Sequence, residues 1–192
     1  MTKPPKRKCL SKQDGCEVDY IRFNSFQPPV CGNLECKVQW SLKQVEKKKQ
    51  KERTKLAREK KTAKDRLKTR NDWLKEAQTV FNAYIRERDK DLPCISCGRH
   101  HSGQYHAGHF CTTKARPDLR FCEVQVRKQC APCNNHLSGN IPLFRQSLIT
   151  IIGEKWVDHI ENGLRGASDW TVEEIKEIKR HYQAELKRIK NI

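Results

Sequence analysis

The 192-residue sequence has little apolar material and too few acidic residues to balance its basic ones. Apolar residues make up 35% and charged residues 33%, which excludes one large hydrophobic core covering the whole chain. The longest apolar run is the short stretch 148–152, interrupted by Thr150, whereas a membrane-spanning helix needs about 20 apolar residues. Residues 1–8 are basic and no apolar stretch follows them, so we expect neither a membrane segment nor a signal peptide.

The charge surplus is large. The chain has 40 Lys and Arg residues against 23 Asp and Glu, a formal net charge of +17. This excess indicates a polyanionic partner. A membrane-surface helix would need an apolar face on its most basic segment, and that segment lacks one, so nucleic acid is favoured over a membrane. The alternative is a basic protein without such a partner.

Ten cysteines without a secretory signal argue against a disulfide framework and for a reducing cytoplasm, where thiolates are more often metal ligands. Two C-x2-C pairs, Cys94 with Cys97 and Cys130 with Cys133, are separated by 32 residues. Each pair can place two sulfurs about 2.3 Å from one Zn²⁺, so the spacing predicts a structural zinc. The alternative is a set of buried or redox-active cysteines.

A second, looser set of cysteines lies near the N-terminus, with six and four residues between its paired members. Its members are Cys9, Cys16, Cys31 and Cys36. They are candidates for a second zinc site. Cys111 and Cys122 are left over, and we expect them to be free thiols that contribute to packing.

The composition divides the chain into a cysteine knuckle at 1–40 with a flexible tail at 1–8, a basic helical arm at 41–72, and a module at 73–192. Residues 43–70 include 14 basic and four acidic residues and no Gly or Pro, which predicts a long exposed helix or a partly disordered arm. We expect its cations to contact phosphates, and the alternative is a solvated linker helix. They are Lys47, Lys48, Lys49, Lys51, Arg53, Lys55, Arg58, Lys60, Lys61, Lys64, Arg66, Lys68 and Arg70.

Apolar periodicity predicts the helices of the third segment. Residues 73–86 form one apolar face, and a second helix after Asn140, with Leu143 and Ile151 among its apolar residues, should end at Gly153. A short helix that includes Trp156 and Ile160 follows, and we expect it to end near Gly163 or Gly166. Thr171-x-x-Glu174 is a capping box that should begin the last helix.

Histidines and amides accompany the two C-x2-C pairs. His106-Ala107-Gly108-His109 lies between the pairs, and Asn134 and His136 follow the second pair. This arrangement resembles the HNH (His-Me finger, ββα-metal) endonucleases. The resemblance implies a zinc-stapled ββα module at 94–140 with His109 as general base, since imidazole can deprotonate water near neutral pH. It also implies a catalytic Mg²⁺ or Mn²⁺, with His106, Asn134 and His136 as candidate ligands.

Two positions depart from the HNH pattern. Gly108 stands where many members have the Asp of an Asp-His pair, so His106 is the candidate to replace that ligand. Gln125 lies where the family's middle Asn orients the loop, and it keeps the amide on a longer side chain. From the residues alone, His106 and His109 could instead be extra zinc ligands or surface histidines. His100 and His101, beside Cys97, are expected to be loop residues.

The layout of nearly the whole chain is similar to the NinG/Rap family of lambdoid phage recombination proteins. The motifs that carry the similarity are Ala-Gly-His-Phe at 107–110, Gln-Cys-x2-Cys-Asn at 129–134 and Ser-Gly-Asn at 138–140. The resemblance implies an endodeoxyribonuclease that cleaves branched recombination intermediates, D-loops and Holliday junctions, in the cytoplasm of a bacterial host.

We therefore expect an α+β protein: a small zinc-stapled ββα-metal (HNH-like) module embedded among helices, with a long basic helix and an N-terminal cysteine knuckle. The expected partner is DNA recognised by shape rather than sequence. Symmetric cutting would favour a homodimer, although no heptad repeat is present to form one. One alternative is a non-enzymatic zinc-containing DNA-binding protein. The other is an RNA-binding or RNA-cleaving protein, although the aromatic motifs of common RNA binders are missing.

Overall fold

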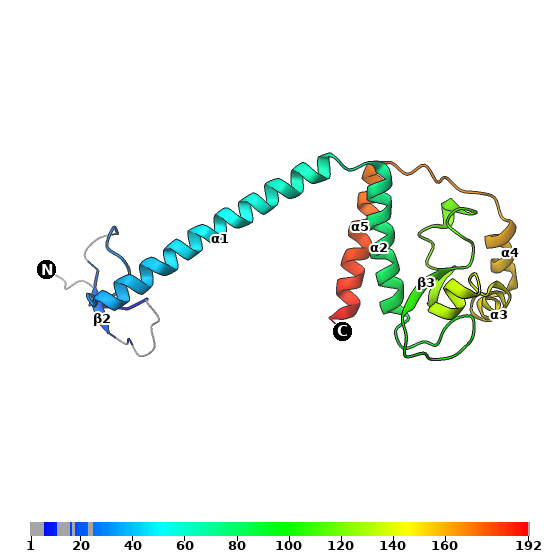
Figure 1. Ribbon diagram of the computed structural model, residues 1–192, viewed down its shortest axis with the longest axis horizontal. Coiled ribbons are helices and arrows are strands. Elements are labelled where there is room, and N and C mark those ends of the chain that lie inside the picture. Colours follow the sequence, from blue (N-terminus) through cyan, green and yellow to red (C-terminus); the bar gives the residue numbers. More distant parts are fainter. Residues whose placement is uncertain (1–5, 11–15, 17, 23–24, 192) are drawn as a thin grey trace. The chain divides into compact units, whose positions relative to one another are not determined.

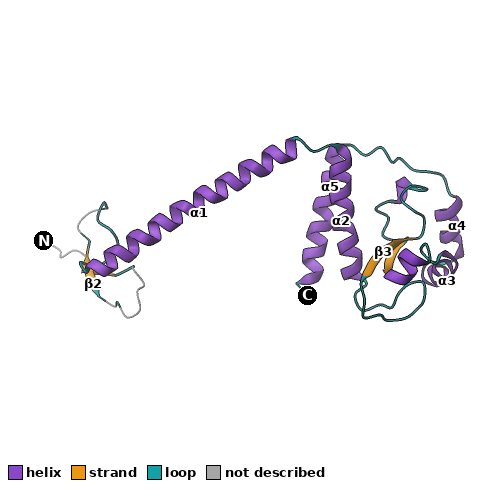
Figure 2. Cartoon of the chain, viewed as in Figure 1, coloured by secondary structure: helices purple, strands orange, loops and turns teal. Residues whose placement is uncertain are grey.

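The computed structural model describes residues 6–10, 16, 18–22 and 25–191, which form a helix-rich α+β fold with two small antiparallel sheets (Figure 1, Figure 2). The predicted mixed class is confirmed. The chain divides into two compact units, Met1–Leu67 and Lys68–Ile192, each with its own cysteine cluster. Within the described part of the chain, no helix is both long enough and apolar enough to cross a membrane.

The first unit begins with a two-stranded sheet. Strand β1 (Lys6–Lys8) pairs antiparallel with β2 (Asp19–Ile21), and Arg7 lies opposite Tyr20. The expected flexible tail at 1–8 is therefore wrong for Lys6–Lys8, while residues 1–5 lie outside the described part. No local pattern indicates β1, because a run of three basic residues has no apolar alternation.

Helix α1 (Leu34–Arg66) is the long element of the first unit. The side chain of Asn33 caps it by accepting a hydrogen bond from the Glu35 amide at 2.8 Å. The basic segment is thus helical, and the helix starts well before residue 43. Every residue from 45 to 64 is exposed in this unit. Lys68 and Arg70, predicted to belong to the arm, lie beyond the end of α1 in the second unit.

The second unit is built on two parallel helices that lie side by side, α2 (Arg70–Arg88) and α5 (Val172–Lys190) (Figure 1). Both begin with a complete capping box, on Thr69 and Thr171. The rings of Phe81 and Tyr182 meet edge to face, with centroids 4.8 Å apart. Both helices are predicted by their apolar faces, and both predictions are confirmed.

A β-hairpin packs against α2. Strand β3 (Tyr105–His109) pairs antiparallel with β4 (Val126–Cys130), and His109 lies opposite Val126. The connection at 110–125 contains a 3₁₀ turn, η1 (Pro117–Leu119), and a short π-helical segment, η2 (Pro132–His136), follows β4. Val126 packs against the buried Phe81 of α2, so this face of the hairpin is joined to the helical core.

Two further helices complete the unit, α3 (Ile141–Ile152) and α4 (Glu154–Asn162), separated by Gly153 as predicted. They form a second core with Phe110, which follows β3. Its buried members are Phe110, Phe144, Leu148, Val157 and Ile160. Leu143, Ile151 and Trp156, predicted to lie on the apolar faces of these helices, are instead exposed. The covered stripe is narrower than the apolar pattern, because the buried contacts of both helices are confined to the face that meets Phe110.

Candidate metal centres and the hairpin histidine

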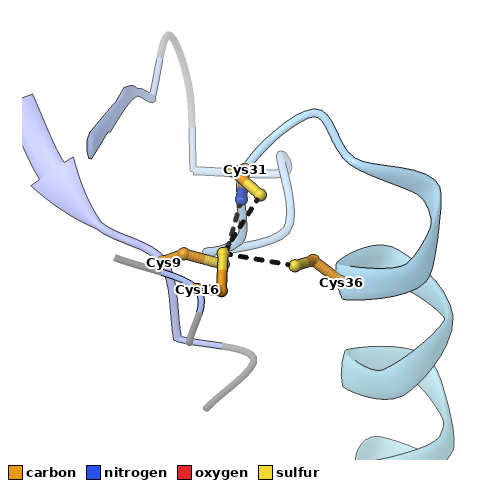
Figure 3. Close-up of side chains that lie close together, drawn as sticks. All are labelled: Cys9, Cys16, Cys31 and Cys36. Carbon is orange, nitrogen blue, oxygen red and sulfur yellow. Dashed lines mark hydrogen bonds between the residues drawn. The ribbon is translucent and has the colours of Figure 1, made fainter. Parts of the chain in front are cut away.

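The first candidate metal centre is a cluster of four cysteines at the start of α1 and in the loops before it (Figure 3). Its members are Cys9, Cys16, Cys31 and Cys36. Their Sγ atoms all lie within 4.8 Å of one another, with 3.7 Å between Cys16 and Cys31 and 3.4 Å between Cys16 and Cys36. Sulfurs bound to one tetrahedral Zn²⁺ at about 2.3 Å are about 3.8 Å apart, so this geometry fits a zinc ion.

Sulfur also makes up most of the buried surroundings of this centre. Its described buried cluster consists of Cys9, Cys31, Cys36 and Val30, with Tyr20 and Trp40 partly buried against it. A core of this size is too small to hold a unit together without help from a disulfide or a metal. The small core therefore also favours a structural metal here.

The second candidate centre joins the loop after α2 to the end of β4. It contains the two C-x2-C pairs, Cys94, Cys97, Cys130 and Cys133. These sulfurs also lie within 4.8 Å of one another, with 3.9 Å between Cys97 and Cys130. The Cys130 amide donates to Cys94 Sγ at 3.3 Å, which favours a thiolate. The predicted grouping of both quartets is confirmed, and both could hold zinc.

The thiols of the second centre have opposite acidities. Burial raises the pKa of Cys94, but backbone amides, above all that of Cys130, outweigh it and bring the pKa down to about 7. Burial and then the neighbouring Cys94 and Cys133 thiols raise the pKa of Cys130 to about 12. Four thiolates so close together repel one another, so all four can ionise only with a cation between them.

His101 makes a contact that the prediction of a simple loop residue did not include. Its Nε2 lies 3.2 Å from Cys97 Sγ. The Tyr105 hydroxyl accepts a hydrogen bond from the His101 amide at 2.6 Å and holds this turn. An imidazole that donates to a metal-bound sulfur orients it without being a ligand itself. The position of His101, four residues after Cys97, is the feature of the sequence that could have indicated this contact.

His109 is the last residue of β3 and is partly buried, with its ring centroid 6.3 Å from that of Phe81. Its Nε2 lies 3.1 Å from the carbonyl oxygen of Arg120. Because a carbonyl oxygen only accepts hydrogen bonds, Nε2 carries the proton and Nδ1 keeps its lone pair. Burial lowers the pKa of His109, although the backbone of Arg120 and of Ala107 opposes this. The ring is thus a neutral imidazole of defined tautomer, able to accept a proton.

The candidate ligands of a catalytic metal do not converge on His109. His106 lies three positions earlier in the strand, so its side chain leaves the opposite face. Its Nε2 is 3.4 Å from Nδ2 of Asn135, and Asn135 also accepts from Asn134 at 2.8 Å. His136 is exposed. Among the residues that the structure describes, neither group of His, Cys, Asp or Glu close enough to share an ion contains a histidine.

The structure accounts for Gly108. A Cβ at this position would lie 2.3 Å from Oε1 of the fully buried Gln129. The Gln129 amide donates to Ser96 Oγ at 2.6 Å and to the carbonyl oxygen of Gly139, so it cannot easily swing away. The space that an Asp side chain would need at position 108 is therefore occupied by Gln129.

Gln125 ties together the two ends of the loop between the hairpin strands. It is fully buried; its Oε1 accepts from the Cys111 amide at 2.7 Å, and its Nε2 donates to the Leu119 carbonyl at 2.9 Å. The longer side chain therefore does keep an amide-to-backbone role. This bond to Leu119 fixes the part of the loop that includes Arg120, whose carbonyl contacts His109.

A buried ion pair fastens the same loop to the segment between α4 and α5. Arg116 Nη2 lies 2.8 Å from Asp118 Oδ2, and both side chains are less than one-tenth exposed. Arg116 donates to the Ile160 carbonyl at 2.6 Å, and Asp118 accepts from the Gly166 amide at 3.1 Å. Arg116 is the main cause that lowers the pKa of Asp118 to about 2. We refer to these two side chains as the clasp.

A large cavity of the second unit lies away from His109. It measures about 460 Å³ and is lined mainly by apolar atoms between the second cysteine centre and α3, with Pro93, Ile95, Arg127 and Ile151 in its wall.

Comparisons with known proteins agree on one family. A sequence profile described as Bacteriophage Lambda NinG protein matches residues 1–191. Protein ninG of Escherichia phage lambda is 44% identical over 206 aligned positions, which cover all of this chain and 97% of that protein. The ninG proteins of Escherichia phage 933W and Salmonella phage P22 are 52% and 51% identical over 125 positions, covering 65% of this chain and 62% and 61% of theirs. No solved structure matches. The chain belongs to the NinG family of phage proteins.

Proposed function

We propose that this protein is a metal-dependent endonuclease of the HNH (His-Me finger) type that cuts branched DNA, such as D-loops and Holliday junctions. The observation that carries the proposal is the state of His109. It ends a hairpin strand, its proton is held on Nε2 by the Arg120 carbonyl, and burial lowers its pKa. These properties are those required of a general base near neutral pH.

The step assigned to His109 is proton abstraction. Nδ1 would take a proton from a water molecule, and the water oxygen would attack the phosphorus of a phosphodiester. The bond from phosphorus to the 3′-oxygen of the leaving strand would then break. The Arg120 carbonyl would accept from the imidazolium while it is charged and keep the ring in place.

The frame around His109 also supports the proposal. Strands β3 and β4 and the short helix η2 follow one another in the order strand, strand, helix, and the second cysteine centre joins their ends. Gln125 fixes the intervening loop by its amide. With a zinc ion bound, the four cysteines would hold this frame rigid and leave His109 on its rim.

A divalent metal bound at such a site would stabilise charge on the scissile phosphate and the leaving oxygen. The candidate ligands His106, Asn134 and His136 do not meet at His109 in this structure, and His106 lies on the other face of β3. We therefore assign no step to these residues. The dependence on Mg²⁺ or Mn²⁺ is part of the proposal, and cleavage with and without each metal tests it.

The basic helix α1 supports DNA as the substrate. Its exposed Lys and Arg side chains offer charge for the phosphate backbone, which is the same for every sequence. An enzyme that binds backbone in this way can select a junction by shape. Two copies bound to one four-way junction would allow it to be cut symmetrically.

The second candidate function is a zinc-containing DNA-binding protein without catalysis. The separation of His106 from His109 favours it, because a catalytic metal site is then incomplete. The two functions differ in what they require of His109: catalysis needs its imidazole, and binding does not.

The deciding experiment compares cleavage of linear, D-loop and four-way DNA with Mg²⁺, with Mn²⁺ and with neither. The wild-type protein should cut branched DNA when a metal is added, and His109→Ala should cut about 10²- to 10⁴-fold more slowly while binding the same DNA equally well. His159→Ala, an exposed histidine on α4, is the matched control and should cut normally. Equal cleavage by His109→Ala would contradict the assignment. A protein that binds DNA but cuts none with either metal would support the second function.

A further inference from the structure

Several arginines of the second unit have a carboxylate partner. Arg88 pairs with Asp89, Arg116 with Asp118, and Arg145 with both Asp158 and Glu161. These pairs neutralise the guanidinium locally. Arg120 and Arg70 differ, because the structure gives neither a carboxylate within salt-bridge distance among the described residues.

Arg120 is held by a neutral acceptor. Its Nη1 donates to Gln78 Oε1 at 3.3 Å, and its Nε is buried with no hydrogen-bond acceptor in the described structure. A guanidinium has five N–H donors in a fixed fork, so most of the hydrogen-bonding capacity of Arg120 is unused. Burial, and then the charge of Arg70, lower the pKa of Arg120. Gln78, which holds Arg120, follows Arg70 by eight residues on α2, about 12 Å along the helix, so an anion between the two cations would be stabilised by both.

Arg70 is also held by neutral acceptors. At the first turn of α2, its Nε donates to the Trp170 carbonyl at 2.7 Å and its Nη2 to the Ser168 carbonyl at 3.2 Å. Both acceptors are uncharged, and Arg70 is exposed. Its remaining donors therefore face solvent while its position is set by two hydrogen bonds.

The place of Arg120 connects this pair to His109. The carbonyl oxygen that holds His109 Nε2 belongs to Arg120 itself, so the guanidinium lies within one side-chain length of the backbone that holds the imidazole. The residue that orients the ring thus also carries a cation that no carboxylate neutralises. A phosphate held by Arg120 would lie near the histidine that we assign as the base.

We propose that Arg120 and Arg70 form a phosphate-binding pair for the DNA strand that is cut, with Arg120 positioning the scissile phosphate against His109 and Arg70 holding a neighbouring phosphate. The role of Arg120 in cleavage rests on the proposed nuclease function, whereas phosphate binding by the two arginines does not depend on it. The pair is separate from the basic arm, since both residues lie in the second unit. Guanidinium suits the task because it binds phosphate oxygens in a bidentate manner.

The first test is the salt dependence of binding of the full-length protein to four-way DNA. Arg120→Gln and Arg70→Gln should each lower the slope of log K against log salt concentration by about 0.9, the value for one phosphate of a duplex. Arg86→Gln is the matched control, because Arg86 is exposed on the same helix as Arg70, about 24 Å further along it. It should leave the slope unchanged.

Two more variants separate charge from folding. Arg120→Lys keeps the charge and should keep the slope of the wild type, while Gln78→Ala removes only the neutral acceptor and should also keep it. If Arg120→Lys lowers the slope as much as Arg120→Gln, or if Arg120→Gln leaves it unchanged, the inference is wrong.

Cleavage supplies the second readout. Arg120→Gln should lower kcat more than Arg70→Gln does, and Arg120→Lys should restore part of it. If the wild type binds DNA but cuts none, the proposed nuclease function fails while the slope test still decides whether the phosphate pair exists. If the wild type cuts but the slopes do not change, the phosphate pair fails and the nuclease function stands.

Discussion

Gly108 has room for a hydrogen atom and nothing larger, because a Cβ there would lie 2.3 Å from Gln129 Oε1 and 3.0 Å from its Cβ. We expect Gly108→Ala to destabilise the protein by about 1–3 kcal/mol, the usual cost of overpacking a buried site. Gly103→Ala is the control, since a Cβ at Gly103 meets nothing within 4 Å. Denaturant unfolding of the two variants checks this. Equal stability would mean that Gln129 can move after all.

His109 leads to a second prediction at the scale of one residue. Its pKa is lowered from 6.5 by burial, and only the neutral ring can take a proton. Cleavage should therefore be constant at neutral pH and fall as the pH drops through a pKa below 6.5. The kcat/KM profile against pH measures this. An acid limb at or above the ordinary histidine pKa would contradict the burial of the ring, and an acid limb that His109→Ala retains would belong to another group.

At the scale of elements, the clasp joins the hairpin loop to the segment before α5. The pKa of Asp118 is lowered from 3.8 to about 2 in the folded protein. Its carboxylate therefore stabilises the fold at any pH above the pKa of the unfolded chain, and this stabilisation is lost as the pH falls from about 4 to about 2. Asp118→Asn should therefore cost on the order of 1–2 kcal/mol at pH 7 and almost nothing near pH 2.

Stability measured against pH tests the clasp. Asp169→Asn removes a carboxylate that is exposed on the segment between α4 and α5, and this variant should follow the wild-type curve. A loss of stability by Asp118→Asn that persists unchanged at pH 2 would show that the side chain acts by shape and not by charge.

The basic arm is the second feature at this scale. Substituting Lys47, Lys51 and Lys55, which lie at intervals of four along α1, by Gln should weaken binding to all DNA sequences alike. The salt slope should fall by about 0.9 for each phosphate that the variant no longer binds. The same three positions changed to Arg keep the charge and serve as the control. An unchanged slope in the Gln variant would make α1 a linker that does not touch DNA.

Local patterns made these helices predictable. The apolar residues of α2 and α5 recur at helical spacing. Thr69 and Thr171 each have an acidic residue three positions later, so a few neighbouring residues determine where each helix begins. Strand β1 was not predictable, because it depends on pairing with β2 and not on its own composition.

In the candidate site, too, the features set by local spacing were predictable, and those set by contacts between distant segments were not. Two residues between paired cysteines restrict where the sulfurs can lie, so the second quartet followed from spacing, and the looser first quartet followed from the cysteines that remained near the N-terminus. The opposite directions of His106 and His109 follow from strand alternation, but only once β3 is known to extend through both. The contact of His106 with Asn135 and the role of Arg120 depend on loops that no local pattern fixes.

At the scale of the whole molecule, each compact unit has one cysteine quartet, so the purified protein should contain two zinc ions per chain. Cys36→Ser should remove one ion and unfold the first unit, and Cys94→Ser should do the same in the second, because structural zinc contributes about 10 kcal/mol or more to folding in small domains. Elemental analysis counts the ions. Cys122→Ser, outside both quartets, should retain two; a folded wild-type protein without zinc would contradict both sites.

The length of α1 sets a scale for what the first unit can touch. A helix of 33 residues is about 50 Å long. Duplex DNA rises about 3.4 Å for each base pair, so a duplex laid beside the helix would need about 15 base pairs to reach from one end to the other. Cys36 lies in the first turn of α1 and belongs to the first candidate metal centre, so a metal bound there would fix the N-terminal end of the helix. If α1 binds DNA along its whole length, as we propose, a duplex arm of about one and a half helical turns would be needed to offer phosphates to both of its ends.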